Sequence, residues 1–179
     1  MIMKLRGYSP KAGKNSYIAP NATIIGNVVM GEDVSVLFGA VIRGDVSAIK
    51  IGDRCNVQDL CMIHATYQKT ETVLEENVSL GHSAIVHGAY IERDTLIGMG
   101  AILMDGVRVG AGSIVGAGSL VTENTIIPPG SLVLGRPAKV IRTLSDEEKD
   151  KALKASQYYL HYKEWYKDSE IVEMEGSDS

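Results

Sequence analysis

Three of the four histidines of this 179-residue chain stand near one another. His82 and His87 lie in the stretch SLGHSAIVHG, and His64 lies upstream in CMIHATY. Three imidazoles can bind a zinc ion and leave its fourth tetrahedral position open to water, as catalytic zinc sites do. Taken singly, each histidine would be interpreted as a packed or surface side chain. Whether the three form a metal site depends on the elements that carry them.

A six-residue repeat runs through most of the chain. From Ile91 the sequence divides into IERDTL, IGMGAI, LMDGVR, VGAGSI, VGAGSL, VTENTI, IPPGSL and VLGRPA, and each block opens with an aliphatic residue. The fifth position is small or compact from Thr95 to Pro137, and the fourth is mostly Gly, which accepts the left-handed backbone of a turn. The same frame extends back to Ile18, with longer intervals after RGD and after IHATY.

A period of six does not keep residues on one stripe of an α-helix, whereas short strands joined by turns can hold it. The repeat therefore predicts a mainly β fold, a parallel β-helix of hexapeptides whose coils stack about 4.8 Å apart around the aliphatic residues. The segment from Ser145 to Glu148 has the sequence of a capping box and predicts a following α-helix.

The same pattern divides the chain into four segments. We predict an N-terminal lead-in at residues 1–17, the hexapeptide β-helix at 18–140, a C-terminal α-helix at 141–167 and a flexible acidic tail at 168–179.

The frame also places the histidines. In such a β-helix three hexapeptides make one triangular coil, which gives the stack three faces. His64 and His87 each follow a strand-opening residue of the same face, so they are expected to stack one coil apart, with Cα atoms about 5 Å from each other. His82 belongs to another face and can join them only across a subunit interface around a threefold axis. Arg43 shares the column of His64 and His87, and Asp59 shares that of His82.

Composition narrows the function classes. The net charge of -4 and the lack of a basic run argue against a nucleic-acid surface. The chain contains neither a long apolar stretch nor a signal-like start, so we expect a soluble cytoplasmic protein without membrane contact. Cys55 and Cys61 occupy small fifth positions, which predicts reduced core thiols instead of metal ligands.

The motifs VIRGDV, NVQDLCMIH and SLGHSAIVHG together resemble the γ-class carbonic anhydrases and their hexapeptide-repeat relatives, over almost the whole chain. The resemblance implies a left-handed β-helix, a homotrimer, and a zinc ion held by His64 and His87 of one subunit and His82 of the next. It also implies reversible hydration of CO2 to bicarbonate, a small-molecule substrate, with a zinc-activated water as nucleophile. Three imidazoles also suit iron or cobalt.

The resemblance further implies an interface pair near the site, a side chain that holds the metal-bound solvent with a neighbour that supports it, and a tyrosine reaching in from the terminal helix. Arg43 and Asp45 are the candidates for the interface pair. Gln58 is the candidate for holding the metal-bound solvent, with Asp59 as its supporting neighbour. Tyr159 is the candidate for the helix tyrosine, and Tyr158 is a close competitor. From the residues alone, the first pair can equally be a salt bridge that fixes the trimer, the second pair turn residues, and the tyrosine a packing contact.

Two departures keep other functions open. Val46 follows RGD where the most active relatives have an acidic residue, and the loop ATYQKTETV lacks their acidic proton-shuttle insertion, leaving only Glu71 as a substitute. LGRPAKVIR also resembles the end of the β-helix in hexapeptide acyltransferases that use CoA. The third hypothesis is a trimeric assembly protein that keeps zinc for stability without catalysis.

Overall fold

The aliphatic residues that open the hexapeptides line one narrow interior. The computed structural model describes residues 1–170. The opening residues from Ile24 to Val133 are buried throughout, whereas Ile18 at the beginning of the repeat is only partly covered. Each is flanked by residues whose side chains point outward, because successive side chains of a strand alternate between its two sides. The predicted core is confirmed.

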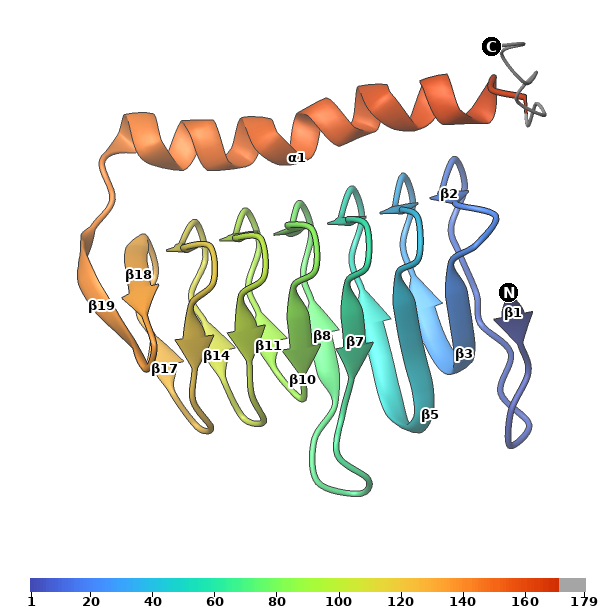
Figure 1. The fold of residues 1–179 in the computed structure, drawn as a ribbon, viewed down its shortest axis with the longest axis horizontal. Helices are drawn as coiled ribbons and strands as arrows, with labels where there is room; N and C mark the ends of the chain where they lie inside the picture. The colour runs from blue at the N-terminus through green and yellow to red at the C-terminus, as the bar shows by residue number, and fades with distance from the viewer. Residues whose placement is uncertain (171–179) are drawn as a thin grey trace, which may run out of the picture.

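The strands form the three faces of a left-handed parallel β-helix (Figure 1). Face 1 consists of β7 (Met62–His64), β10 (Ile85–His87), β13 (Ile102–Leu103) and β16 (Leu120–Val121). Face 2 consists of β8 (Thr72–Leu74), β11 (Tyr90–Ile91), β14 (Arg108–Val109) and β17 (Ile126–Ile127). Face 3 consists of β2 (Tyr17–Ile18), β4 (Ser35–Val36), β6 (Asn56–Val57), β9 (Ser79–Leu80), β12 (Leu96–Ile97), β15 (Ile114–Val115) and β18 (Ser131–Gly135).

Two longer strands bend around the edge between face 1 and face 2. β3 (Thr23–Met30) pairs along β5 (Val41–Ile51), and β1 (Ile2–Met3) pairs with β3. The beginning of β5 pairs with β7 and its end pairs with β8, so a single strand belongs to both faces. The register of β3 and β5 shifts after Gly26, which leaves residues 45–48 in a bulge. This bulge and the loop between β7 and β8 are the two interruptions that the spacing of the repeat predicted.

Turns between strands use a left-handed backbone at the fourth position of the repeat. Positive φ angles occur there as predicted, at Gly100, Gly106, Gly112, Gly118, Asn124 and Gly130. The cysteines also lie as predicted, because both are buried in the core cluster. Burial raises the pKa of the Cys55 thiol to about 12 and that of the Cys61 thiol to about 11, so both stay protonated near neutral pH.

The solenoid ends in an antiparallel turn and a helix. β19 (Ala138–Thr143) pairs antiparallel with β18, and α1 (Asp146–Lys167) begins after it, so residues 141–143 belong to a strand and not to the helix. Pro137 occupies the small fifth position of its block, but no further coil follows it in the described part of the chain. It is exposed, because the chain reverses direction just after Gly135 instead of completing another coil.

Helix α1 lies along face 3 (Figure 1). The predicted capping box is present, with Ser145 as the N-cap and Glu148 three residues into the helix. Tyr166 stacks on Tyr17 of β2, and the buried Lys163 forms an ion pair with Asp33. No helix among residues 1–170 is long and apolar enough to cross a bilayer. Most of the predicted acidic tail, residues 171–179, lies outside the described residues.

Candidate metal centre

Two of the histidines lie side by side on face 1, as the frame predicted. His64 ends β7 and His87 ends β10, and the two residues are direct partners in the parallel ladder. Nδ1 of His64 lies 3.2 Å from Nε2 of His87, and the ring centroids are 5.1 Å apart. The neighbouring Ile63 and Val86 point into the core and fix both backbones, so the two imidazoles project from the same outer surface.

Each of these imidazoles is held by a carboxylate on its other nitrogen. Nε2 of His64 lies 2.9 Å from Oδ1 of Asp45, and Nδ1 of His87 lies 3.0 Å from Oδ1 of Asp105. The ring nitrogens that do not contact these carboxylates are Nδ1 of His64 and Nε2 of His87, and these two face each other. Two nitrogens bound to one tetrahedral zinc ion at about 2.0–2.1 Å lie roughly 3.3 Å apart. The donor types and the observed 3.2 Å separation thus fit two ligands of a zinc ion.

His82 lies at the edge of face 3, apart from this pair. Its Nδ1 is 2.7 Å from Oδ2 of Asp59, which confirms that the two residues share a column. Within residues 1–170, Nε2 has no carboxylate partner, and 44% of the side chain is exposed. Within residues 1–170 of the single chain, no group of three or more His, Cys, Asp or Glu side chains is arranged to hold a metal ion.

Arg43 and Asp45 both contact His64, each at a different ring nitrogen. Nη1 of Arg43 donates to Oδ2 of Asp45 at 2.7 Å, and Nη2 lies 3.5 Å from Nδ1 of His64. Burial lowers the pKa of His64, and the positive charge of Arg43 adds to this effect, although Asp45 opposes it. Burial would raise the pKa of Asp45, but the hydrogen bond with His64 and the charge of Arg43 hold it below its ordinary value. The result favours a neutral imidazole, the form that binds metals.

Asp105 is a site residue that the sequence analysis did not identify. Its carboxylate accepts hydrogen bonds from Thr66 at 2.5 Å and from Thr70 at 2.9 Å, in addition to its contact with His87. Burial would raise the pKa of Asp105, but these three hydrogen bonds lower it overall. The repeat carries only a partial signal: because Leu103 pairs with Val86, Asp105 lies in the coil after that of His87 but one position past its column.

Gln58 is tied into the chain beside His82. Its Oε1 accepts the backbone N–H of His82 at 3.1 Å, and its Nε2 donates to Asn56 at 3.0 Å and lies 3.4 Å from Ser79 Oγ. The Gln58 side chain is buried, and both hydrogens of its amide group have an acceptor. Gln58 therefore fixes the turn that carries His82, and its predicted contact with metal-bound solvent stays a prediction.

Of the two helix tyrosines, Tyr159 lies closer to the site residues. It is half-buried, and burial together with the negative charge of Asp59 raises its pKa to about 12. Tyr158 is exposed and stacks against Tyr162 on the helix surface. His161 is also exposed, and its ring packs edge-on with that of Trp165.

Comparison with known proteins shows the family. A curated carbonic anhydrase from Geobacillus kaustophilus is 44% identical over 93% of this chain and 91% of its own length. The chain belongs to the γ-class carbonic anhydrase family. A γ carbonic anhydrase of Arabidopsis thaliana mitochondria is 39% identical over 97% of this chain and 66% of the plant protein. The assignment to an enzyme family of the lyase type is thus confirmed.

The γ-class carbonic anhydrases share their architecture with other hexapeptide proteins. The family model for the bacterial transferase hexapeptide (six repeats) matches residues 88–123. The structure of a hexapeptide transferase family protein from Anaplasma phagocytophilum has a TM-score of 0.89 and 36% identity, covering 93% of this chain and 98% of that one. AntD, an N-acyltransferase of Bacillus cereus, shares only the fold, at a TM-score of 0.58 and 16% identity over 85% of this chain and 91% of its own.

Proposed function

We propose that this chain hydrates CO2 reversibly to bicarbonate at a zinc site between the subunits of a homotrimer. His64 and His87 of one subunit and His82 of the next would be the ligands. The observation that carries the proposal is the pairing of each imidazole with one carboxylate, which leaves one nitrogen of each ring for a metal. Such carboxylate contacts orient metal-ligating histidines and fix the nitrogen that carries the proton. Relatives named carbonic anhydrase support the substrate.

The chain's own residues would prepare the ligands. Asp45, Asp59 and Asp105 each accept the N–H of one imidazole, so the opposite nitrogen presents its lone pair. Arg43 holds the carboxylate of Asp45 in place. The chemistry that a bound zinc ion supplies is the activation of water as a nucleophile near neutral pH.

The chain has few acidic side chains that could carry away the proton released by hydration. Val46 lies beside Asp45 where an acid would serve as a shuttle, and the carboxylate of Glu71 forms an ion pair with Lys50 at 2.9 Å. We therefore expect proton transfer to the solvent to limit the turnover of this enzyme. Slow hydration with a complete metal site would agree with the proposal.

The surface of the chain supports the assembly. Leu60 and Met99 are 67% and 58% exposed, and they occupy the turns directly before and after that of His82 in the stack of coils. On face 1, a column of outward apolar side chains runs beside His64 and His87, formed by Met62, Ile85, Ile102 and Leu120. Burying one apolar surface against the other would bring His82 of one subunit toward the pair of its neighbour.

The test is metal content together with stopped-flow CO2 hydration, for the full chain purified in zinc-replete and in anaerobic preparations. We expect about one zinc, iron or cobalt ion per chain. His82→Ala should lose both metal and hydration, whereas His161→Ala, a matched change on the helix, should lose neither.

Other outcomes would favour the remaining hypotheses. Absence of metal in both preparations would contradict the site. Activity on an acyl-CoA substrate that survives complete metal removal would favour the hexapeptide acyltransferase function. Bound metal with no hydration would favour an assembly protein that keeps the metal for stability, or a different small substrate.

A further inference from the structure

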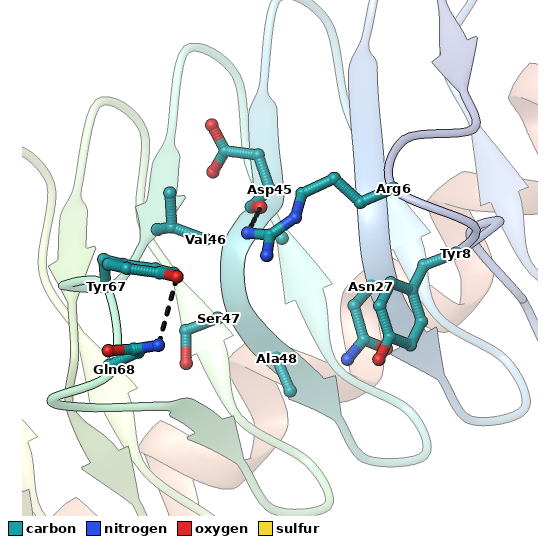
Figure 2. A pocket seen from close by; sticks show the side chains of 10 residues that line it. Arg6, Tyr8, Asn27, Asp45, Val46, Ser47, Ala48, Tyr67 and Gln68 are labelled. Carbon is teal, nitrogen blue, oxygen red and sulfur yellow. Dashed lines mark hydrogen bonds between the residues drawn. The ribbon is translucent and has the colours of Figure 1, made fainter.

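A pocket opens beside Asp45, between the two interruptions of the repeat (Figure 2). It has a volume of about 250 Å³. Its walls come from the bulge of β5, from the loop after β7 and from the N-terminal segment that carries Arg6 and Tyr8. The bulge contributes Asp45, the residue that also holds His64. The pocket and the candidate metal centre therefore share a wall.

The charge in this pocket is unbalanced. Arg6 and Asp45 are the two charged residues among those that line it. Both carboxylate oxygens of Asp45 already have partners: Oδ2 accepts a hydrogen bond from Arg43, and Oδ1 contacts the ring of His64. No ion pair to Arg6 is formed within residues 1–170. The pocket therefore presents a positive charge that the described part of the chain does not neutralise.

Among the described residues, Arg6 makes only weak contacts, and most of its N–H donors have no acceptor there. Its guanidinium carbon lies 5.7 Å from the ring centre of Tyr67, and Nη1 lies 3.4 Å from the backbone oxygen of Asp45. A guanidinium group has five N–H donors. The Tyr67 hydroxyl accepts a hydrogen bond from Gln68 at 3.1 Å, so its own hydrogen can be donated to a ligand (Figure 2).

We propose that this pocket binds a small planar oxyanion, a bicarbonate or an organic carboxylate, through Arg6 and the Tyr67 hydroxyl. A guanidinium matches two oxygens of such an anion with two parallel hydrogen bonds. Val46 in the wall adds no negative charge that would repel the anion. The choice of bicarbonate as the preferred ligand rests on the proposed function. Bicarbonate is the product of CO2 hydration and would bind next to the place where it forms.

The experiment titrates the full-length protein with sodium bicarbonate and, separately, with sodium acetate, following the backbone amide NMR signals of Val46 and Gln68, which line the pocket in every variant. It is run on protein as purified and after removal of metal by a chelator. We expect millimolar dissociation constants that weaken about tenfold in Arg6→Gln, as for loss of a charged hydrogen-bond partner. Tyr67→Phe should weaken binding less. Lys4→Gln removes a charge from the same N-terminal segment outside the pocket and should change nothing.

The outcomes separate this proposal from the activity. Binding that depends on Arg6 and persists without metal supports the anion site, even if CO2 hydration is absent. Preference for bicarbonate over acetate identifies the product as the ligand, and the reverse identifies an organic carboxylate. Equal binding by Arg6→Gln and the unchanged chain overturns the proposal, as does binding that disappears only when the metal is removed, since the anion would then sit on the metal. Failure to bind either anion at 100 mM, roughly the weakest affinity worth detecting, also overturns it.

Discussion

The candidate site is built from three similar pairs of residues, each an imidazole with its own aspartate. The three aspartates come from different parts of the repeat: the bulge of β5, the edge of face 3 and the turn after β13. Asp45 also serves Arg43, and Asp105 also holds two threonines of the loop after β7. The orientation of each ring is therefore set by residues that are themselves fixed by other contacts, which limits the rearrangement needed to bind a metal.

Asp105 gives the sharpest prediction at this scale. Asp105→Leu removes the acceptor for His87 Nδ1 and leaves Thr66 and Thr70 without their shared partner. We expect zinc affinity to fall about 10- to 100-fold, the usual cost of losing such a contact. Competition with a coloured chelator measures the affinity directly, without relying on activity.

Two further variants make this result specific. Asp105→Asn retains an oxygen that can accept from His87, so its affinity should fall less than that of the leucine variant. Asp94→Asn changes an aspartate that accepts a hydrogen bond from Asn77, with no histidine involved, and should leave zinc binding unchanged. If Asp105→Leu bound zinc as tightly as the unchanged chain, a positioning role for Asp105 would be excluded.

At the scale of the elements, the turn after β12 offers a matched pair of glycines. A Cβ atom on Gly98 would lie 2.5 Å from the backbone nitrogen of Ala117 in the next coil, whereas one on Gly100 would meet nothing within 4 Å. Gly100 instead has a φ of +65°, which costs another residue about 1–2 kcal/mol. Gly98→Ala should therefore lower the free energy of unfolding more than Gly100→Ala, because backbone of adjacent coils cannot move apart locally. Chemical denaturation of the two variants measures this difference, and equal losses would contradict close stacking at Gly98.

The helix cap gives a prediction with a defined pH range. Hydrogen bonds from Arg142, first, and from the Ser145 backbone lower the pKa of Glu148 from 4.5 to about 2. Since the folded pKa is depressed, the stabilisation is present above about pH 4.5 and is lost as the pH falls toward 2. The difference in melting temperature between the unchanged chain and Glu148→Gln should shrink over this range. Glu147→Gln, which loses only a surface contact with Lys151, should show a smaller and flatter difference.

These elements also show what could be predicted from sequence. The six-residue spacing of aliphatic side chains was enough to place His64 against His87 and Asp59 against His82, because a stack of coils turns a sequence period into a spatial column. The repeat did not predict that the chain reverses direction after Gly135, because a proline at the small fifth position fits the repeat as well as a serine does. The repeat did not predict the contact of Asp105 with His87, because this contact runs diagonally between coils. It depends on the length of the side chains, which the register of backbone positions does not specify.

At the scale of the whole molecule, the three faces have different surroundings. Helix α1 contacts β2, β4 and β12 of face 3, and Ser35 of β4 is buried. Face 1 carries the histidine pair beside its column of half-buried apolar residues. The turns next to His82 expose leucine and methionine side chains to solvent in the single chain. A heterologous interface, in which two different surfaces meet, closes into a ring of three when the rotation is 120° and would cover both surfaces at once.

Leu60 tests this arrangement. Leu60→Glu places a charge in the proposed interface but faces solvent in the single chain, where the leucine is 67% exposed. We expect the variant to fold with an unchanged circular dichroism spectrum, to sediment as a monomer, and to lose its metal, because His82 would no longer reach the pair on the neighbouring subunit. Ile126→Glu makes the same change at a residue that is 73% exposed on face 2 and should remain trimeric with metal bound. A Leu60→Glu protein that stayed trimeric would place the interface elsewhere, and a monomer that kept one tightly bound zinc per chain would show that a single subunit holds the metal by itself.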